Sequence, residues 1–168
     1  MSYRRRKMNM LIKSVRSYTK LSQQELAGKQ GVTPVVINQW EEASSVPDKL
    51  VQTRLYAFCQ EVNIPIYDMM LFEMSSKQGY DSETFASFFM KSDVAKDLDS
   101  TYNRMQWAGE EYLLEKTIAD SNGKISRVND PVSSEIMYWI GYIYRYWHFY
   151  KNESSSRIHS QAGFKTMK

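Results

Sequence analysis

Apolar side chains recur at helical spacing from the start of the chain. One buried helix face is predicted by the i, i+3, i+4, i+7 pattern of four apolar residues, Met8, Leu11, Ile12 and Val15. A second helix is expected from Ser22 to Gln30. Ser22 stands three positions before Glu25, and this spacing forms a capping box that satisfies free N–H groups of a first turn.

A third helix is expected directly after a tight turn. Gly31 can end the second helix, since glycine accepts the positive φ of a helix C-cap without steric strain. Thr33 can cap the next helix, and Pro34 suits its first position, where a missing N–H costs nothing. This third helix is predicted to reach about Glu42.

Two further helices are expected before a domain boundary. The fourth opens at Asp48 or Lys49 and ends near residue 61, and a short fifth helix covers about residues 65–73. The segment that follows is polar and has no apolar period. It therefore predicts a linker over residues 75–82.

The second half of the chain is also predicted to be helical. Ser92 or Asp93 can cap a helix with one apolar side, formed by Val94, Leu98, Tyr102 and Met105. Residues 110–119 favour another helix, with a turn at 120–123, although a hairpin over residues 110–128 is the alternative. The chain therefore has a mainly all-α fold, in which residues 83–168 form a second helical domain.

The longest helix is expected to open at Asp130-Pro131 and to run to about Asn152, before a last short helix capped within residues 154–156. It carries an apolar stripe, predicted to enter the core, at Ile136, Trp139, Ile140, Ile143, Trp147 and Tyr150. Five other residues lie off this stripe and predict a protein interface, namely Tyr138, Tyr142, Arg145, Tyr146 and Phe149. The alternative is that these five side chains lie on the surface without binding a partner.

The composition indicates which broad class of protein the chain belongs to. The chain has 168 residues, of which 42% are hydrophobic and 24% charged, which is typical of a folded globular protein. The single cysteine, Cys59, excludes an internal disulfide and favours a reducing cytoplasm. The amino terminus does not resemble a signal peptide, and Arg145 and His148 interrupt the only long apolar helix, so no membrane span is expected.

Positive charge is concentrated in the first quarter of the chain. Residues 1–40 hold eight Lys and Arg against one acid, Glu25, whereas residues 75–168 hold twelve of each sign. Such an excess predicts an anionic partner, with nucleic acid preferred over an anionic membrane.

Enzymatic chemistry is not expected. His148 and His159 have no neighbouring cysteines or carboxylates at metal-ligand spacing, which argues against a metal site. The serines of 154–156 lack the Gly-x-Ser-x-Gly elbow of a nucleophile, and no phosphate-cradling glycine loop occurs. We therefore expect no catalytic residues and no cofactor.

Several residues in order resemble the Xre or lambda-repressor-like family of DNA-binding domains. They form the segments Leu21-Ser22-Gln23-Gln24-Glu25-Leu26-Ala27, Gly31-Val32-Thr33 and Ile37-Asn38-Gln39-Trp40-Glu41, with Pro47 after them. The resemblance covers residues 8–74 and implies a five-helix domain whose second and third helices form a helix-turn-helix. An ordinary helical hairpin is the alternative. Ala43 departs from the family, which often has glycine there.

The resemblance implies a set of DNA contacts. Gln23 matches the family residue that opens the second helix and touches a backbone phosphate. The exposed early positions of the third helix meet base edges in that family, and here they are Thr33, Pro34, Val35, Asn38 and Gln39. Asn38 and Gln39 can hydrogen-bond to adenine, whereas Pro34 and Val35 can only contact thymine methyl groups.

Cations around the helix-turn-helix are expected on phosphates. Four of them would fix the register without distinguishing bases, namely Lys13, Arg16, Lys29 and Lys49. Residues 1–7 form a basic arm with the tetrad Arg4-Arg5-Arg6-Lys7, which could lie along a groove. The alternative is a solvated, disordered tail.

The aromatic segment 138–147, followed by Glu153-Ser154-Ser155-Ser156, is similar to carboxy-terminal parts of Xre-type antitoxins. This resemblance implies a regulator that represses its own operon and neutralises a cognate toxin. One alternative is a phage or mobile-element repressor whose second domain only dimerises, and another is a catalytic second domain. The expected partners are a double-stranded DNA operator, a toxin protein and a second copy in a homodimer.

Overall fold

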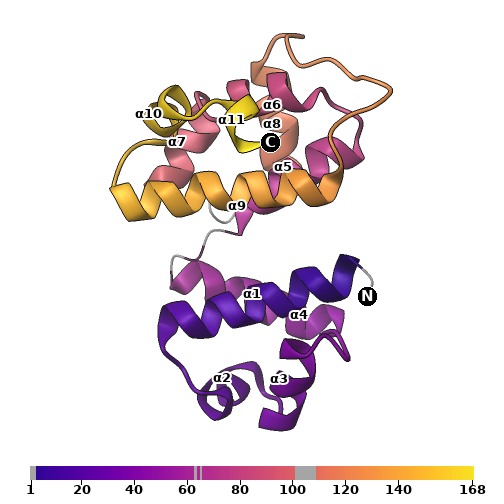
Figure 1. Ribbon diagram of the computed structural model, residues 1–168, viewed down its shortest axis with the longest axis vertical. Coiled ribbons are helices and arrows are strands. Elements are labelled where there is room, and N and C mark those ends of the chain that lie inside the picture. Colours follow the sequence, from indigo (N-terminus) through magenta and orange to yellow (C-terminus); the bar gives the residue numbers. More distant parts are fainter. Residues whose placement is uncertain (1–2, 63, 65, 101–108) are drawn as a thin grey trace. The chain divides into compact units, whose positions relative to one another are not determined.

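The structure is a computed structural model that describes residues 3–62, 64, 66–100 and 109–168 (Figure 1). The protein has an all-α fold, and within these ranges it forms eleven helices and no strand. The chain divides into two compact units, Met1–Ile64 and Pro65–Lys168. Among the described residues, no helix combines the length and apolar character needed to cross a bilayer.

The described residues of the first unit form four helices: α1 (Tyr3–Thr19), α2 (Gln23–Gln30), α3 (Pro34–Glu41) and α4 (Lys49–Glu61). Helix α3 packs against both α1 and α2. The predicted apolar face of α1 is confirmed, since all four of its residues are buried, as are Leu26, Ala27, Ile37, Trp40 and Leu55.

Two expectations about the borders of the first unit are wrong. Helix α1 begins at Tyr3, so the backbone of the basic tetrad is helical and does not form a free arm. Arginine and lysine are good helix formers, and no Gly or Pro separates them from the apolar face that follows. The fifth helix belongs to the second unit, so the part of the first unit that the structure describes has four helices and not the five implied by the family resemblance.

The expected linker over residues 75–82 is also wrong. Helix α5 (Tyr67–Lys77) covers its first part and α6 (Ser82–Phe89) begins at its end. The serines there are polar but buried, because the Ser75 hydroxyl donates to Phe72 O and the Ser76 hydroxyl donates to Val132 O at 2.6 Å. Their hydrogen bonds stay inside the protein, so polarity did not signal exposure.

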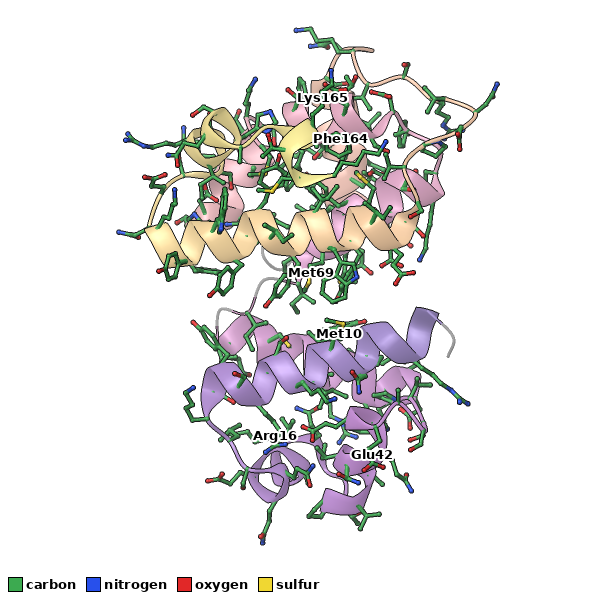
Figure 2. All side chains as sticks on the ribbon, viewed as in Figure 1. Met10, Arg16, Glu42, Met69, Phe164 and Lys165 are labelled. Carbon is green, nitrogen blue, oxygen red and sulfur yellow. The ribbon has the colours of Figure 1, made fainter. Side chains whose placement is uncertain are left out.

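The other helices of the second unit are α7 (Asp93–Asp99), α8 (Glu110–Asp120), α9 (Ser134–Lys151), α10 (Ser155–Gln161) and α11 (Phe164–Met167). Their core contains mostly aromatic and aliphatic side chains, and Phe164 of α11 points among them (Figure 2). The rings of Phe85 and Phe89 both meet Phe72 edge to face, with centroids 5.4 Å apart. Such edge-to-face contacts add to the stability gained from burial.

Residues 110–128 do not form a hairpin. Helix α8 ends at Asp120, and the chain then returns to form an isolated antiparallel bridge between Tyr80 and Arg127. The helix expected from Ser92 is capped by that serine but ends at Asp99, and Tyr102 and Met105 lie outside the described residues.

Helix α9 starts later than expected and faces the core differently. Ser133 caps it, and the segment from Asp130 stays non-helical. Its buried side chains include Met137, Ile140 and Tyr144, whereas Ile136 and Tyr150 of the expected stripe are 42% and 76% exposed. The crossing of α5 over Gly141 selects this face, because the helix is apolar almost all round and its sequence alone does not choose one.

Candidate nucleic-acid interface

The start and the end of α2 both have the geometry that their residues predict. Ser22 Oγ accepts a hydrogen bond from Glu25 N at 3.2 Å, and Glu25 Oε2 accepts one from Ser22 N at 2.7 Å. Glu25 Oε2 accepts from both the backbone N and the hydroxyl of Ser22, and these two bonds lower the pKa of Glu25 because they stabilise its carboxylate. Gly31 ends α2 with φ 62°, in the left-handed region that favours glycine. The capping box and the glycine C-cap are confirmed.

Helix α3 has one buried and one exposed face. Ile37 and Trp40 are buried, while Thr33, Pro34, Val35 and Gln39 are exposed. Val35 is 66% exposed. Thr33 occupies the N-cap position, but its side chain makes no capping hydrogen bond. Its hydroxyl therefore stays available on the exposed face.

Glu41, the last residue of α3, anchors the three helices to one another. Its carboxylate accepts from Arg16 Nη1 at 2.7 and 2.9 Å and from Gln23 Nε2 at 2.7 Å. Asn9 of α1 also donates to the Glu41 carbonyl. Arg16 and Glu41 are largely shielded from water, and a charge-assisted pair in such surroundings fixes geometry more firmly than a surface pair. Figure 2 shows Arg16 on the side of α1 toward α2 and α3.

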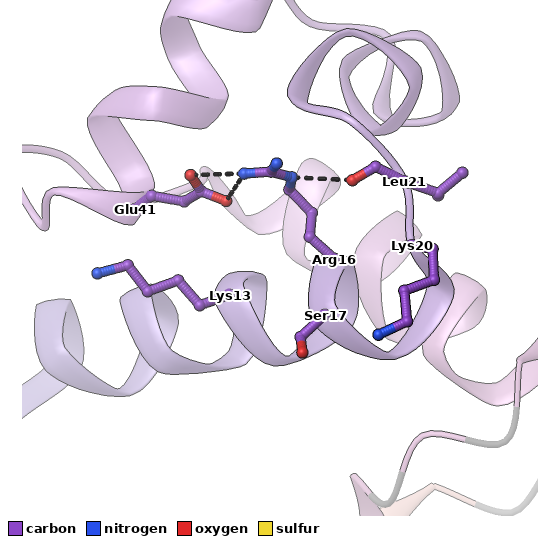
Figure 3. A pocket seen from close by; sticks show the side chains of 6 residues that line it. All are labelled: Lys13, Arg16, Ser17, Lys20, Leu21 and Glu41. Atoms are coloured by element: carbon purple, nitrogen blue, oxygen red, sulfur yellow. Dashed lines mark hydrogen bonds and ion pairs between the residues drawn. The ribbon is translucent and has the colours of Figure 1, made fainter.

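This network holds two of the residues expected to touch DNA. Gln23 Nε2 also donates to Asn38 Oδ1 at 3.2 Å, and both side chains are half-buried. A bidentate contact of Asn38 with adenine uses Oδ1 as an acceptor, and the hydrogen bond from Gln23 occupies one of the two lone pairs of that oxygen. Arg16, which we expected on a phosphate, instead pairs with Glu41 and donates to Leu21 O (Figure 3).

The cations of the first unit belong to segments other than α3. Residues 1–64 hold ten Lys and Arg against five Asp and Glu, whereas α3 contains no Lys or Arg. Lys13, Lys49 and Arg5 are exposed, and Lys29 Nζ lies 5.4 Å from the centre of the Phe58 ring. The side chains of Arg4, Arg6 and Lys7 lie outside the described residues.

The predicted partner surface on α9 is only partly exposed. Tyr146 and Phe149 are 50% and 41% exposed, and Tyr142 is half-buried. Tyr146 stacks on Tyr142 and on Tyr150, with ring centroids 6.1 and 6.0 Å apart. We call Tyr142, Tyr146, Phe149 and Tyr150 the aromatic row.

The other two members of the predicted partner surface are buried. Tyr138 and Arg145 are 2% and 3% exposed, so the expectation that they face outward is wrong. Arg145 donates to both oxygens of Asp68 at 3.1 Å and to Asp99 Oδ1 at 2.7 Å. A buried guanidinium is costly unless it is paired with an opposite charge and hydrogen-bonded, and these two carboxylates meet that need. Burial by itself disfavours the charged guanidinium, but the adjacent carboxylates of Asp68 and Asp99 favour it more strongly, so the pKa of Arg145 is raised.

No pattern in the sequence pointed to this ion network or to the one around Glu41. Asp68 and Arg145 lie 77 positions apart. The only available signal was that Asp68 and Arg145 each stand between apolar or aromatic neighbours, and this signal does not identify a partner.

The chain matches no protein-family model, no curated protein and no solved structure.

Proposed function

We propose that the protein is a sequence-specific DNA-binding regulator in which α3 enters the major groove of double-stranded DNA. The observation that carries the proposal is the orientation of α3. Ile37 and Trp40 of α3 are buried against the first unit. Thr33, Val35 and Gln39, which we call the leading face of α3, are exposed to solvent. This is the arrangement a recognition helix needs, because a groove-reading face must be rigid and uncovered.

Charge and side-chain chemistry support the proposal. In the proposed complex, cations outside α3 contact the phosphates, and the Lys and Arg of the first unit lie on α1, α2, α4 and, for Lys20, the connection between α1 and α2. Gln39 supplies a hydrogen-bonding amide, while Pro34 and Val35 supply apolar contacts to thymine methyl groups. The base preference is therefore expected to favour A·T pairs.

The test is selection of bound duplexes from a random-sequence pool, followed by Kd measurement at fixed salt. Val35→Glu places a carboxylate on the leading face of α3 and should raise Kd for the selected duplex about tenfold or more. Ala57→Glu, at an exposed position of α4 in the same unit, carries the same charge change. Equal effects of the two variants, or no enrichment of any sequence, would contradict the proposal.

A second candidate function adds a toxin protein as partner, so that the chain is an antitoxin that also represses its own operon. The aromatic row favours it, since exposed tyrosine and phenylalanine side chains are typical of interface hot spots.

Co-expression with the product of the neighbouring gene tests this candidate. Tyr146→Ala should reduce rescue from toxicity, whereas Tyr112→Ala on α8 should not, because Tyr112 is 53% exposed and thus matched to Tyr146 at 50%. Absence of rescue by the unaltered chain would remove this candidate and leave the DNA-binding proposal standing.

A further inference from the structure

The outer face of α9 is apolar along nearly the whole helix. Ile136, Tyr146 and Tyr150 are exposed, and Trp139 and Ile143 between them are half-buried. These five residues follow one another at alternating steps of three and four positions, so they lie in one line along the helix. We call them the α9 seam. Such spacing is typical of a helix that pairs with another helix.

The α9 seam is free of charged side chains. Between Glu135 in the first turn of α9 and Lys151 in the last, the only Lys, Arg, Asp or Glu is Arg145, which is buried against Asp68 and Asp99. Single apolar side chains are common on protein surfaces, but a continuous apolar row rimmed by polar residues marks an interaction site. The seam is therefore a surface for another helix or protein.

The order of the seam residues is self-complementary. Ile143 stands in the middle, with Ile136 seven positions before it and Tyr150 seven positions after it. In an antiparallel pair of α9 helices, Ile136 of each copy lies opposite Tyr150 of the other, and Ile143 meets Ile143. Trp139 lies beside Tyr146 of the second copy, because they stand four and three positions from Ile143. A two-fold interface requires such reciprocal pairs.

The charges at the two ends of α9 favour the antiparallel orientation. Parallel copies would bring the two Lys151 ammonium groups to the same end and would align the two helix dipoles, and both effects are unfavourable. In an antiparallel pair, Glu135 of each copy shares an end with Lys151 of the other. Charge complementarity between the ends therefore fits a second copy of the same helix.

The apolar area is sufficient for a dimer of moderate affinity. Covering the α9 seam and the rest of the aromatic row in both copies removes roughly 1,000 Å² from water, since a fully buried aromatic side chain accounts for about 150–250 Å². This area is at the lower end for specific protein interfaces, so we expect a dimer with Kd in the micromolar range.

We infer that two copies of the chain associate through an antiparallel pairing of their α9 helices, with the two-fold axis at Ile143. The inference concerns the second unit and does not depend on the DNA-binding proposal. It assigns the face that carries Tyr146 to a second copy and not to a toxin. The sequence did not predict this surface, because four of the five seam residues were expected in the core.

Disulfide cross-linking of the full chain tests the pairing and its orientation. Ile143→Cys should give a covalent dimer under mild oxidation, because its two Cβ atoms face each other within disulfide range. Ile136→Cys and Tyr150→Cys should give none alone and a covalent dimer when mixed. Ile118→Cys, at a half-buried isoleucine of α8, is the matched control. Cys59 should stay unreactive, because burial raises its pKa to about 12.

Sedimentation equilibrium measures the dimer without cross-links. Tyr146→Glu should raise the dimer Kd about tenfold or more, because it places a charge in the centre of the interface. Tyr112→Glu, at a similarly exposed tyrosine of α8, should leave Kd unchanged. Thermal unfolding of both variants shows whether they fold as the parent does. If Tyr146→Glu lowers Tm, the cross-linking result decides.

Three results would overturn the inference. A parent chain that stays monomeric well above micromolar concentration would exclude the dimer. Cross-linking of Ile136→Cys with itself would exclude the antiparallel orientation. Binding of the neighbouring gene's product to the α9 seam, while the chain alone stays monomeric, would assign this face to the toxin. The DNA-binding proposal would stand in each case, since it depends on α3.

Discussion

Gly141 determines how closely α5 and α9 approach each other. A Cβ at this position would lie 2.6 Å from Asp68 O and 3.0 Å from Met69 Cα, both backbone atoms that cannot move aside independently. Gly141→Ala should therefore lower the free energy of unfolding by about 2–3 kcal/mol, as overpacking does in other cores. Urea unfolding followed by circular dichroism measures the change.

Gly28 supplies the matched control within a helix. It lies on the exposed side of α2, and a Cβ there would meet nothing within 4 Å. Gly28→Ala should raise stability by about 0.5–1 kcal/mol, because alanine restricts the unfolded chain and favours helix. If both alanine variants shifted stability in the same direction, the close crossing at Gly141 would be disproved.

Individual residues were predictable where chemistry acts locally. Ser22, Glu25 and Gly31 cap α2 as their spacing requires. Arg145 was misjudged because its two acids lie in other helices, and no local pattern indicates which charged residue of an aromatic helix turns inward. Ala43 adopts φ 57° at the position where the family resemblance expects glycine, so this departure leaves a locally strained backbone.

At the scale of elements, helices were predictable but their limits and buried faces less so. The start of α9 was misplaced because hydrogen bonds of Val132 with the Ser76 and Ser82 side chains keep the preceding segment non-helical. Those serines lie 50 or more positions away, beyond the range of any capping rule. The face of α9 depends likewise on α5, a partner that its own periodicity does not identify.

The start of α1 was also predicted wrongly, because a basic segment was expected to lie outside the helix. Its basic amino-terminal residues suggested a separate arm, since charge is a signal for solvation. Helix propensity is independent of that signal, and straight-chain cations extend a helix as well as apolar residues do. The backbone of the tetrad is consequently helical, and the side chains of Arg4, Arg6 and Lys7 lie outside the described residues.

For the whole molecule, the two-part organisation was predictable, but its boundary was not. The division falls after Ile64, about ten residues before the expected linker, because α5 belongs with α9. The two short helices α2 and α3 and the turn between them were predictable, since their capping residues, glycine and proline are close in sequence. The network of Arg16, Gln23, Asn38 and Glu41 was not, as it depends on how three helices meet.

The central claim is that the leading face of α3 contacts DNA bases. It is tested most directly by recording amide chemical shifts of the isotope-labelled full chain as the selected duplex is added. The account predicts that the largest changes cluster at residues 33–39, with further changes at Gln23. Changes confined to residues 65–168, or changes in the first unit that spare α3, would contradict it.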